Sequence, residues 1–441
     1  MNGELLIGLM GLVWLIGLIA IRIPIAYSMI LVGGVGVTVL NGPAIFMSQL
    51  KDLAYAQFSI YDLSVVPMFV LMGNVATRAG LSQDLFRAAN AWLGWMRGGV
   101  AMAAIAACAG FGSVCGSSLA TASTMGRVAL PELSRYNYAG SLATGTLAAG
   151  GVLGILIPPS VVLVIYAIIV EANIVTMFMA AFVPGLIAVA FFMITIFIYV
   201  TLRPDSGPPG DAVSRREFFE ATLRVGPVLA IFGLVIGGIY LGFFNPTPAA
   251  AIGVFLVTVY GIVRGAVRVP DMRIALLDTA KTTGMIYLIL LGAEMLKIFM
   301  SRGGVPQAAA EMMANSGLAP VTILILLLIA LILLGCLMDS LSMILLAIPF
   351  FWPVIAELDF GMGAEELKIW FGILALIVVE LGLITPPVGM NVFVISAMAK
   401  GVPMRDTFIG VMPFFVAELL RIGLLVAFPA IALWLPRLLS G

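Results

Sequence analysis

Two carboxylates that stand alone in apolar sequence are the residues best suited to chemistry. Asp339 lies between two long charge-free runs, 312–338 and 340–356. Glu380 lies two residues before Gly382, at the end of another apolar run. An unpaired charge in an apolar setting is energetically costly, so an acidic residue there is a functional candidate. The alternatives are structural: a hydrogen bond or a water-exposed tip for Asp339, and a packing carboxylate capped by a hydroxyl for Glu380.

A cluster of small polar residues is the second such feature. The apolar window 98–126 is too long for a single straight crossing and is interrupted by glycines and serines between Gly110 and Ser118. Hydroxyl and backbone oxygens can coordinate a hard cation. For each serine the alternative is helix packing or a bond to the preceding helical turn. For the cluster Gly112–Ser118 as a whole, we favour a binding site.

The composition excludes most other chemistry. The 441 residues are 62% hydrophobic and 10% charged, with 22 basic and 22 acidic residues and no histidine. An average soluble domain is about 45–50% apolar and about 25% charged, so a soluble enzyme and a nucleic-acid binder are excluded. The lack of histidine removes imidazole metal sites and Ser–His triads. The three cysteines lie in apolar stretches without paired spacing, and we interpret them as buried small hydrophobic residues.

These residues must be positioned by helices in a lipid bilayer. A helix needs about 20 apolar residues to cross a membrane, and such runs lack the alternating pattern of barrel strands. We predict an all-α polytopic membrane protein with about ten to twelve membrane elements, the first of which is retained rather than cleaved. The charge-free windows are 23–50, 98–126, 136–170, 172–202, 225–263, 312–338, 340–356 and 381–399.

The chain divides into two halves of similar length. A polar segment at 203–224, rich in Gly, Pro and charges, separates the N-terminal half, 1–202, from the C-terminal half, 225–441. This composition is typical of a surface connector. We expect a short amphipathic helix near Arg215–Arg224.

Both halves carry the same two unusual elements. Each has a long apolar run with a polar break, at about 98–126 and about 318–356, which we interpret as a re-entrant hairpin. Each then has a helix broken at a Pro-Pro pair, at 158–159 in the first half and at 386–387 in the second. Paired, Gly/Pro-interrupted hydrophobic segments of this kind indicate the binding site of a secondary transporter.

Charge placement predicts that the repeat is inverted. One such feature alone would indicate only helix bending or close packing, but both recur in the same order. Arg97 and Arg127 flank the first hairpin, whereas no Lys or Arg occurs between Gly303 and Leu367. The positive-inside rule therefore places the ends of the two hairpins on opposite sides of the membrane.

At these motifs the sequence resembles the large membrane subunit of the tripartite ATP-independent periplasmic (TRAP) transporters, over essentially the whole chain. Two departures stand out: Pro248 replaces the usual Glu in Asn245-Pro-Thr-Pro248, and Cys115 replaces a usual Ser. The segments that carry the resemblance are Gly112–Leu133, Gly145–Leu186, Gly335–Ile355, Trp370–Ala399 and the terminal Leu433-Trp-Leu-Pro436.

The resemblance implies a transporter of the bacterial inner membrane with an elevator-type mechanism. Such systems couple uptake of organic acids, carboxylates above all, to inward sodium movement. The expected partners are a small four-span membrane subunit and a periplasmic substrate-binding protein, together with the lipid bilayer. Sodium is the expected coupling ion, and no organic cofactor and no nucleic acid are expected.

The oxygen-rich positions of both halves are the candidates for ion and substrate binding. Glu171, Glu294 and Glu418 are interpreted instead as interfacial or subunit-contact charges, and Arg127 as a membrane-boundary residue. Candidates for sodium are Gly112, Ser113, Gly116, Ser117, Ser118, Thr121, Ile157, Gly335, Asp339, Ser340, Thr385, Gly389 and Asn391. Candidates for substrate are Ser118, Thr121, Pro158, Pro159, Pro386, Pro387 and Asn391.

Two other functions remain as alternatives. A stand-alone ion-coupled anion symporter could share the inverted-repeat fold and need no binding protein. A membrane-embedded enzyme is disfavoured, since the sequence offers no histidine, no Ser–Lys or paired-Asp arrangement on neighbouring spans, and no Gly-rich phosphate loop followed by Lys. Neighbouring genes for a small membrane protein and a secreted binding protein would favour the tripartite transporter over the symporter.

Overall fold

The computed structural model describes residues 3–211, 213–314 and 317–439, and every regular element among them is a helix. The two predicted halves therefore each include a few residues outside this description, and the predicted connector includes one, residue 212. The first half contains α1 (Gly3–Ala20), α2 (Ile25–Asn41), α3 (Pro43–Phe58), η1 (Tyr61–Ser64), α4 (Val65–Arg78), α5 (Leu81–Leu93), α6 (Gly99–Cys115), α7 (Ser118–Arg135), α8 (Gly140–Leu156), α9 (Val161–Ile169) and α10 (Ile174–Leu202).

The second half starts after a short turn of helix, η2 (Pro204–Ser206). It contains α11 (Arg215–Tyr240), α12 (Pro246–Val263), α13 (Val269–Arg302), α14 (Val305–Ala314), α15 (Pro320–Gly335), α16 (Ser340–Ala356), α17 (Ala364–Gly382), α18 (Met390–Met398), α19 (Met404–Ala427) and α20 (Ala430–Leu439).

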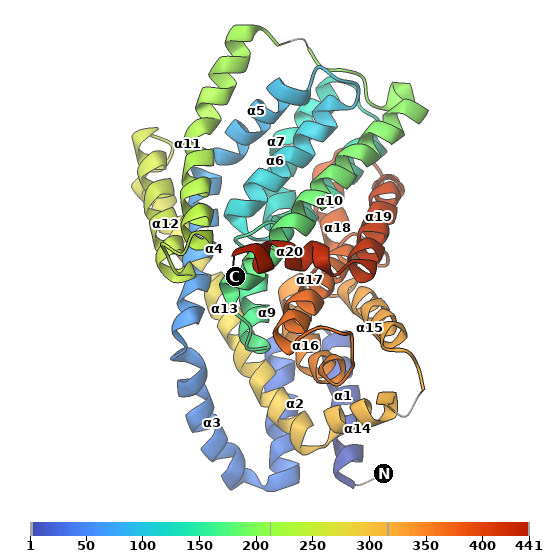
Figure 1. Cartoon of the computed structure of the whole chain (residues 1–441). Coiled ribbons are helices and arrows are strands. Elements are labelled where there is room, and N and C mark those ends of the chain that lie inside the picture. The colour runs from blue at the N-terminus through green and yellow to red at the C-terminus, as the bar shows by residue number, and fades with distance from the viewer. Residues whose placement is uncertain (1–2, 212, 315–316, 440–441) are drawn as a thin grey trace.

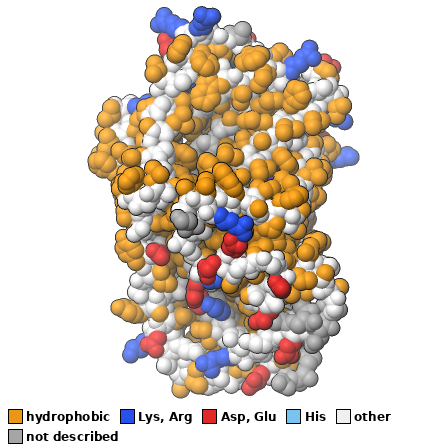
Figure 2. All heavy atoms as spheres, in the orientation of Figure 1, with side chains coloured by type: hydrophobic (Ala, Val, Ile, Leu, Met, Phe, Trp, Pro, Cys, Tyr) orange, Lys and Arg blue, Asp and Glu red, His pale blue; other side chains and the backbone are white. Residues whose placement is uncertain are grey.

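Several of these helices are long and apolar enough to cross a membrane. Within the described ranges six qualify singly: α1, α10, α11, α12, α13 and α19. Two bent pairs raise the number to as many as eight, α3 with η1 and α4 (60°) and α8 with α9 (48°). Hydrophobic side chains are dense over the upper part of the face seen in Figure 2, whereas acidic and basic side chains are more frequent in its lower part. A densely apolar surface is expected where a protein contacts lipid. The chain is thus a multi-pass membrane protein.

The helices pack into two groups. In the outer group, α13 packs along α2 and α4, and α12 packs on α4. In the hairpin group, α6, α7, α10 and α19 pack on α8, and α15 and α16 pack on α17. Contacts of α4 with α6 and of α13 with α16 join the two groups, and α5 packs on both α6 and α11, which itself packs on α12. Figure 1 shows α1–α3 and α14 at one end of the molecule and α5–α7 at the other.

The helices of the hairpin group approach closely at glycines. A Cβ added at Gly112 in α6 would lie 2.4 Å from Cα of Gly154 in α8. A Cβ added at Gly382, the last residue of α17, would lie 2.8 Å from Cα of Gly335, the last residue of α15. Only glycine permits such contacts. The first helix of each hairpin is thereby held against the helix that leads into a Pro-Pro pair.

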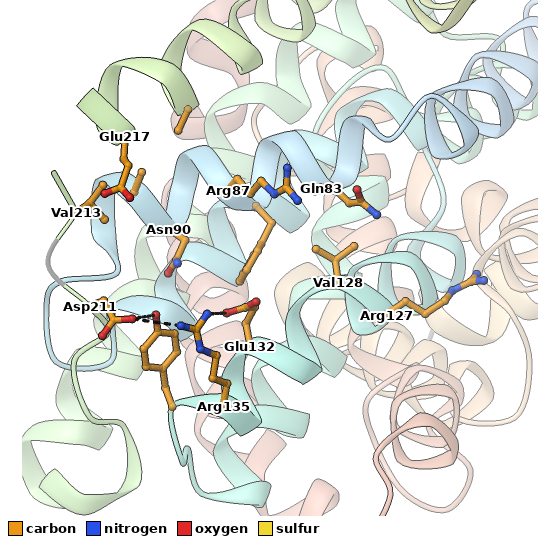
Figure 3. Close-up of a pocket in the computed structure, with 14 residues that line it drawn as sticks. Gln83, Arg87, Asn90, Arg127, Val128, Glu132, Arg135, Asp211, Val213 and Glu217 are labelled. Atoms are coloured by element: carbon orange, nitrogen blue, oxygen red, sulfur yellow. Dashed lines mark hydrogen bonds and ion pairs between the residues drawn. The ribbon is translucent and has the colours of Figure 1, made fainter. Parts of the chain in front are cut away.

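The connector is shorter than predicted. No separate amphipathic helix occurs at Arg215–Arg224, because this stretch forms the first turns of the long helix α11. Ser214 and Glu217 form a capping box there, which starts the helix before the apolar sequence begins. The irregular part packs on the end of α7, where Asp211 pairs with Arg135 (3.5 Å), as Figure 3 shows. Asp211 also accepts a hydrogen bond from Tyr136 (2.8 Å), the residue after α7.

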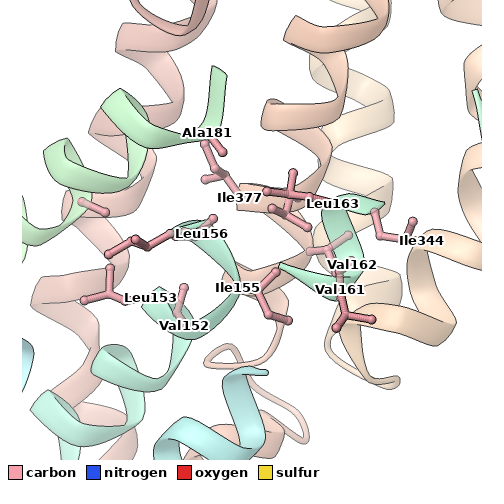
Figure 4. Packing of buried hydrophobic residues seen from close by; sticks show 14 of the residues in the cluster. Val152, Leu153, Ile155, Leu156, Val161, Val162, Leu163, Ala181, Ile344 and Ile377 are labelled. Atoms are coloured by element: carbon pink, nitrogen blue, oxygen red, sulfur yellow. The ribbon is translucent and has the colours of Figure 1, made fainter. Parts of the chain in front are cut away.

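Both Pro-Pro pairs lie between two helices. Pro158-Pro159 separates α8 from α9, and Pro386-Pro387 separates α17 from α18; both bonds are cis. The first pair is buried and the second is exposed. Figure 4 shows hydrophobic residues on both sides of the first break packed with Ala181 of α10, Ile344 of α16 and Ile377 of α17. The first break is therefore fixed within the core by apolar packing.

Candidate functional site

The tips of the two hairpins meet at one cavity of about 400 Å³. The first tip is the turn between α6 and α7, and the second is the turn between α15 and α16. The start of α9 and the outer-group helices α4 and α13 complete the wall. The lining residues are Val70, Asn74, Cys115, Gly116, Ser117, Ser118, Leu119, Ala120, Ile155, Val161, Val162, Thr282, Met285, Ile286, Asp339, Ser340 and Leu341.

Local sequence explains the first tip. Gly116 adopts a left-handed conformation (φ +64°) that glycine tolerates, and its N–H donates to the carbonyl of Gly112 (2.7 Å) to end α6. Ser117 then caps α7, because its Oγ accepts a hydrogen bond from the N–H of Ala120 (3.4 Å). The chain therefore reverses within two residues and leaves polar atoms at the turn.

The second tip uses a carboxylate where the first uses a hydroxyl. Asp339 is the N-cap of α16, and its Oδ2 accepts a hydrogen bond from the N–H of Ser342 (3.1 Å). Its other oxygen accepts from the hydroxyl of Ser342. The side chain is half-buried and lines the cavity. Asp339 thus has the structural hydrogen bond that was its alternative role, and it also faces the candidate site.

Glu380 joins the two tips. The hydroxyl of Ser118, the first residue of α7, donates to Oε2, and the hydroxyl of Ser340, the first residue of α16, donates to Oε1. Glu380 is fully buried in α17, and both serines are buried. The sequence pointed to this carboxylate and to a hydroxyl partner. It did not indicate two partners from opposite hairpins, because both contacts join residues far apart in the chain.

Three helices begin at the cavity. The first residues of α7, α9 and α16, namely Ser118, Val161 and Ser340, all line it. Ser117, Ser160 and Asp339 each cap one N–H group of these helices. The remaining N–H groups and the partial positive charge of a helix N-terminus suit an anionic group. The carboxylate of Asp339 and the hydroxyls suit a cation. The cavity can therefore hold an anion and cations close to each other.

Two further candidates lie in the core with unpartnered oxygens. Thr121 in α7 and Asn391 in α18 are both 0% exposed. Within the described part of the chain, Oγ1 of Thr121 and Oδ1 of Asn391 have no hydrogen-bond partner. Nδ2 of Asn391 donates to the carbonyl of Ala148 in α8 (3.3 Å). Buried polar atoms are normally paired, so these two oxygens are available to a ligand.

The other candidates do not line this cavity. The hydroxyl of Ser113 donates to the carbonyl of Gly110 (2.7 Å), and that of Thr385 donates to the carbonyl of Leu381 (2.6 Å). Both hydroxyls are therefore bonded to the preceding turn of the chain. Gly389 is the left-handed N-cap of α18 (φ +57°). The remaining candidates away from the cavity are Gly112, Ile157, Pro158, Pro159, Gly335, Pro386 and Pro387. Their roles in binding stay predictions.

Two polar residues that line the cavity are not among the candidates chosen from the sequence. Asn74 of α4 and Thr282 of α13 belong to the outer group and face the tips across the cavity. Asn74 donates to Oγ1 of Thr279 (2.9 Å), which ties α4 to α13. The sequence does show Asn74 as a single amide in the apolar stretch Val65–Ala76. Which way its side chain points depends on the position of α13, which the sequence does not give.

The prediction that Glu418 is an interfacial or subunit-contact charge is wrong. Glu418 and Arg421 of α19 are 1% and 0% exposed and form an ion pair. Arg421 also donates to the carbonyl of Pro184 in α10 (3.0 Å). The i, i+3 spacing places both side chains on one helix face, and pairing lets both charges be buried. The pair links α19 to α10 in the hairpin group.

A second, polar cavity of about 650 Å³ lies between α5, α7, the connector and α11. Figure 3 shows Arg87 and Gln83 on one wall, with Glu132 and Arg135 on the other. Arg127 lines this cavity and is exposed. Its place near a membrane boundary stays a prediction. This second cavity has no single charge, since arginines and carboxylates both line it.

Sequence comparisons extend over nearly the whole chain. A family model described as "Tripartite ATP-independent periplasmic transporter, DctM component" matches residues 12–431. The C4-dicarboxylate TRAP transporter large permease protein DctM of Pseudomonas aeruginosa is 34% identical over 381 residues, which cover 86% of this chain and 87% of that protein. The sialic acid TRAP transporter large permease protein SiaM of Vibrio cholerae is 29% identical over 429 residues, which cover 97% of this chain and 98% of that protein.

Solved structures share the fold. The Alcanivorax borkumensis YdaH transporter has a TM-score of 0.66 at 14% identity, covering 88% of this chain and 89% of that one. Neisseria gonorrhoeae MtrF, described as one of a class of antimetabolite efflux pumps, has a TM-score of 0.51 at 16% identity, covering 89% and 84%. At these identities the likeness concerns the fold alone.

Proposed function

We propose that this chain, which belongs to the family of large TRAP-transporter permease subunits, couples uptake of a small organic acid to inward sodium movement. The observation that carries the proposal is the single cavity at which both hairpin tips meet. Relatives of the chain are named as permeases for C4-dicarboxylates, sialic acid and ectoine. The three helix N-termini at the cavity favour a substrate that bears a carboxylate.

The first sodium site is proposed where oxygens converge on the glycine face of α8. A Cβ added at Gly154 would lie 2.5 Å from Oγ1 of Thr121 and 2.8 Å from the carbonyl oxygen of Ser117. A Cβ added at Gly151 would lie 3.0 Å from Nδ2 of Asn391 and 3.2 Å from the carbonyl oxygen of Ser118. The missing side chains leave room beside these atoms, among which the hydroxyl of Thr121 and the carbonyl oxygens of Ser117 and Ser118 are ligands of the kind that a hard cation takes. Nδ2 of Asn391 is a hydrogen-bond donor and cannot be such a ligand. The unpartnered oxygens of Thr121 and Asn391 support the assignment.

The second sodium site is proposed at the other tip. Asp339 and Ser340 are the N-cap and first residue of α16, as Ser117 and Ser118 are of α7. Gly335 ends the helix before this tip, and the segment from Thr385 to Gly389 follows α17. A carboxylate next to a cation keeps its charge because the ion offsets desolvation. We assign Asp339 as the charged ligand or near neighbour of this ion.

The movement we propose is that of an elevator built on an inverted repeat. The hairpin group would carry ions and substrate past the outer group, whose helices α4 and α13 face the tips across the cavity. The expected setting is a bacterial inner membrane, and the expected partners are a small four-span subunit and a periplasmic binding protein. The order hairpin, broken helix and long helix in both halves supports the repeat.

Sodium dependence tests the proposal directly. The full complex, reconstituted in proteoliposomes with its binding protein, should take up a dicarboxylate when a sodium gradient is imposed. Potassium alone should not support uptake. Uptake driven equally by a proton gradient in the absence of sodium would refute the sodium assignment.

The role of the binding protein separates this function from the stand-alone symporter. The purified chain, reconstituted alone, should not transport free substrate at a useful rate, and adding both partners should restore uptake. Rapid uptake by the chain alone would instead establish the stand-alone symporter.

A further inference from the structure

We infer that Glu380 is a positioning residue that couples the two hairpin tips, so that a cation bound at one tip raises the affinity of the other. The inference rests on the proposed function, because it assumes that both tips bind cations. Its basis is the pair of hydrogen bonds from Ser118 to Oε2 and from Ser340 to Oε1. One carboxylate therefore holds the first residue of α7 and the first residue of α16.

Burial makes the two contacts interdependent. Glu380 is 0% exposed, while Ser118 is 1% and Ser340 is 4% exposed. If either tip moved away, one carboxylate oxygen would be left without a partner where water does not reach it. The arrangement in which both tips are seated is therefore favoured over those with only one tip seated. Any ligand that seats one tip then favours the other, and the effect is reciprocal.

The carboxylate has no counterpart in the first half. Glu380 corresponds to Val152, a buried residue of α8, when Pro386-Pro387 is aligned with Pro158-Pro159. If helix packing were the sole requirement at this position, an apolar residue would serve in both halves, as Val152 does in the first. The single carboxylate is instead shared by both tips, and each of its oxygens has a serine of its own. A carboxylate shared by both tips is required if cation binding at one tip is to affect the other, and it is not required if the two tips bind cations independently.

A triple-mutant box tests the coupling. Ser118→Ala and Ser340→Ala each remove one of the two hydrogen bonds to Glu380. The two substitutions are made singly and together, first in the wild-type protein and then in the Glu380→Met variant. Methionine has a similar length and fills irregular space, so it removes both hydrogen bonds with little change in volume. Sodium affinity is read from the rise in melting temperature on adding sodium chloride to the purified complex, with potassium chloride as the reference. Ser28→Ala, a change at a buried serine of α2 whose hydroxyl bonds to Pro24, is the matched control.

The expected coupling is large enough to measure. In the wild-type background the effects of the two serine changes on sodium affinity should deviate from a simple product by about fivefold or more, a typical lower value for linked sites. In Glu380→Met the two effects should multiply, and sodium dependence should lose its cooperativity. Ser28→Ala should behave as wild type.

Each contrary result has a distinct meaning. The inference is overturned if the two serine effects multiply already in the wild type, or if their coupling survives unchanged in Glu380→Met. If Glu380→Met does not fold, Glu380→Leu replaces it, since leucine likewise offers neither donor nor acceptor to the two serines; coupling as strong as wild type would then overturn the inference. If sodium neither stabilises the complex nor drives uptake, the proposed function fails and the inference fails with it. Sodium-driven uptake with independent tips rejects only the inference.

Discussion

Asp339 both caps α16 and lines the cavity between the hairpin tips, and two substitutions separate these roles. Asparagine is as good an N-cap as aspartate, so Asp339→Asn should keep the bond to the N–H of Ser342 and remove only the charge. We expect it to raise the sodium concentration for half-maximal uptake about tenfold, equivalent to about 1.4 kcal/mol, with an unchanged melting temperature. Sodium titration and thermal denaturation of one preparation measure both quantities.

The matched substitution is Asp339→Ala, which removes the cap as well. It should show the same change in sodium dependence and a further loss of about 1 kcal/mol in stability. If Asp339→Asn lowers the melting temperature while sodium affinity stays at the wild-type value, Asp339 has only a structural role.

The buried pair of Glu418 and Arg421 should stabilise the fold by mutual neutralisation. Arg421→Met leaves the Glu418 carboxylate buried without its partner. Breaking a buried pair in this way typically costs about 3–5 kcal/mol, so the protein should unfold at a markedly lower temperature. The double change Glu418→Leu with Arg421→Met should recover most of that stability, because neither charge remains. Failure of the double variant to recover would indicate a role for the pair beyond neutralisation.

Residue types were more predictable than residue partners. The isolated carboxylates at 339 and 380 were visible because charges are rare in apolar sequence. That Glu380 binds serines of both hairpins was not, since such contacts depend on how distant helices pack. The burial of Glu418 likewise depends on how distant helices pack. Its partner Arg421 lies within one helical turn, but only the position of α10 shows that both side chains are buried.

At the scale of helices, the contact between α6 and α8 depends on a pair of glycines. Gly112→Ala would place a Cβ 2.4 Å from the backbone of Gly154, and backbone cannot move aside as a flexible side chain can. We expect α6 and the first tip to shift, with loss of folded protein and of sodium-dependent stabilisation. Gly233→Ala in α11, where an added Cβ meets nothing within 4 Å, is the control and should be neutral or slightly stabilising. Equal behaviour of the two variants in size-exclusion and melting experiments would contradict this packing.

The helix boundaries show which local signals suffice. Pro-Pro pairs and glycine–serine clusters placed the breaks at 158–159 and 386–387 and the tips near 116–118 and 339–340, because these residues disfavour helix on their own. The connector was harder. Its charged second part indicated surface sequence, but the capping box of Ser214 and Glu217 starts α11 there, and the apolar stretch that follows extends the helix to Tyr240.

At the scale of the molecule, the two helix groups contact each other around the cavity, and the proposed transport cycle requires them to slide. Met285 of α13 and Leu341 of α16 lie on opposite groups and line the same cavity. Cysteines at these two positions, in a background without Cys108, Cys115 and Cys336, can be joined by a short linker that contains a disulfide. We expect the link to arrest uptake and reduction to restore it.

A link within one group should have no such effect. Ile198 of α10 and Val416 of α19 both belong to the hairpin group and line a single surface groove away from the tips. The same linker between cysteines at these positions should leave uptake near that of the unlinked protein, since no relative movement of α10 and α19 is required. Uptake in linked vesicles, before and after reduction, measures the effect, and gel mobility after protease cleavage between the linked helices verifies that the link has formed. If the link between Met285 and Leu341 leaves uptake intact, the two groups do not move past each other during transport, and substrate must cross by a smaller rearrangement of the hairpin tips themselves.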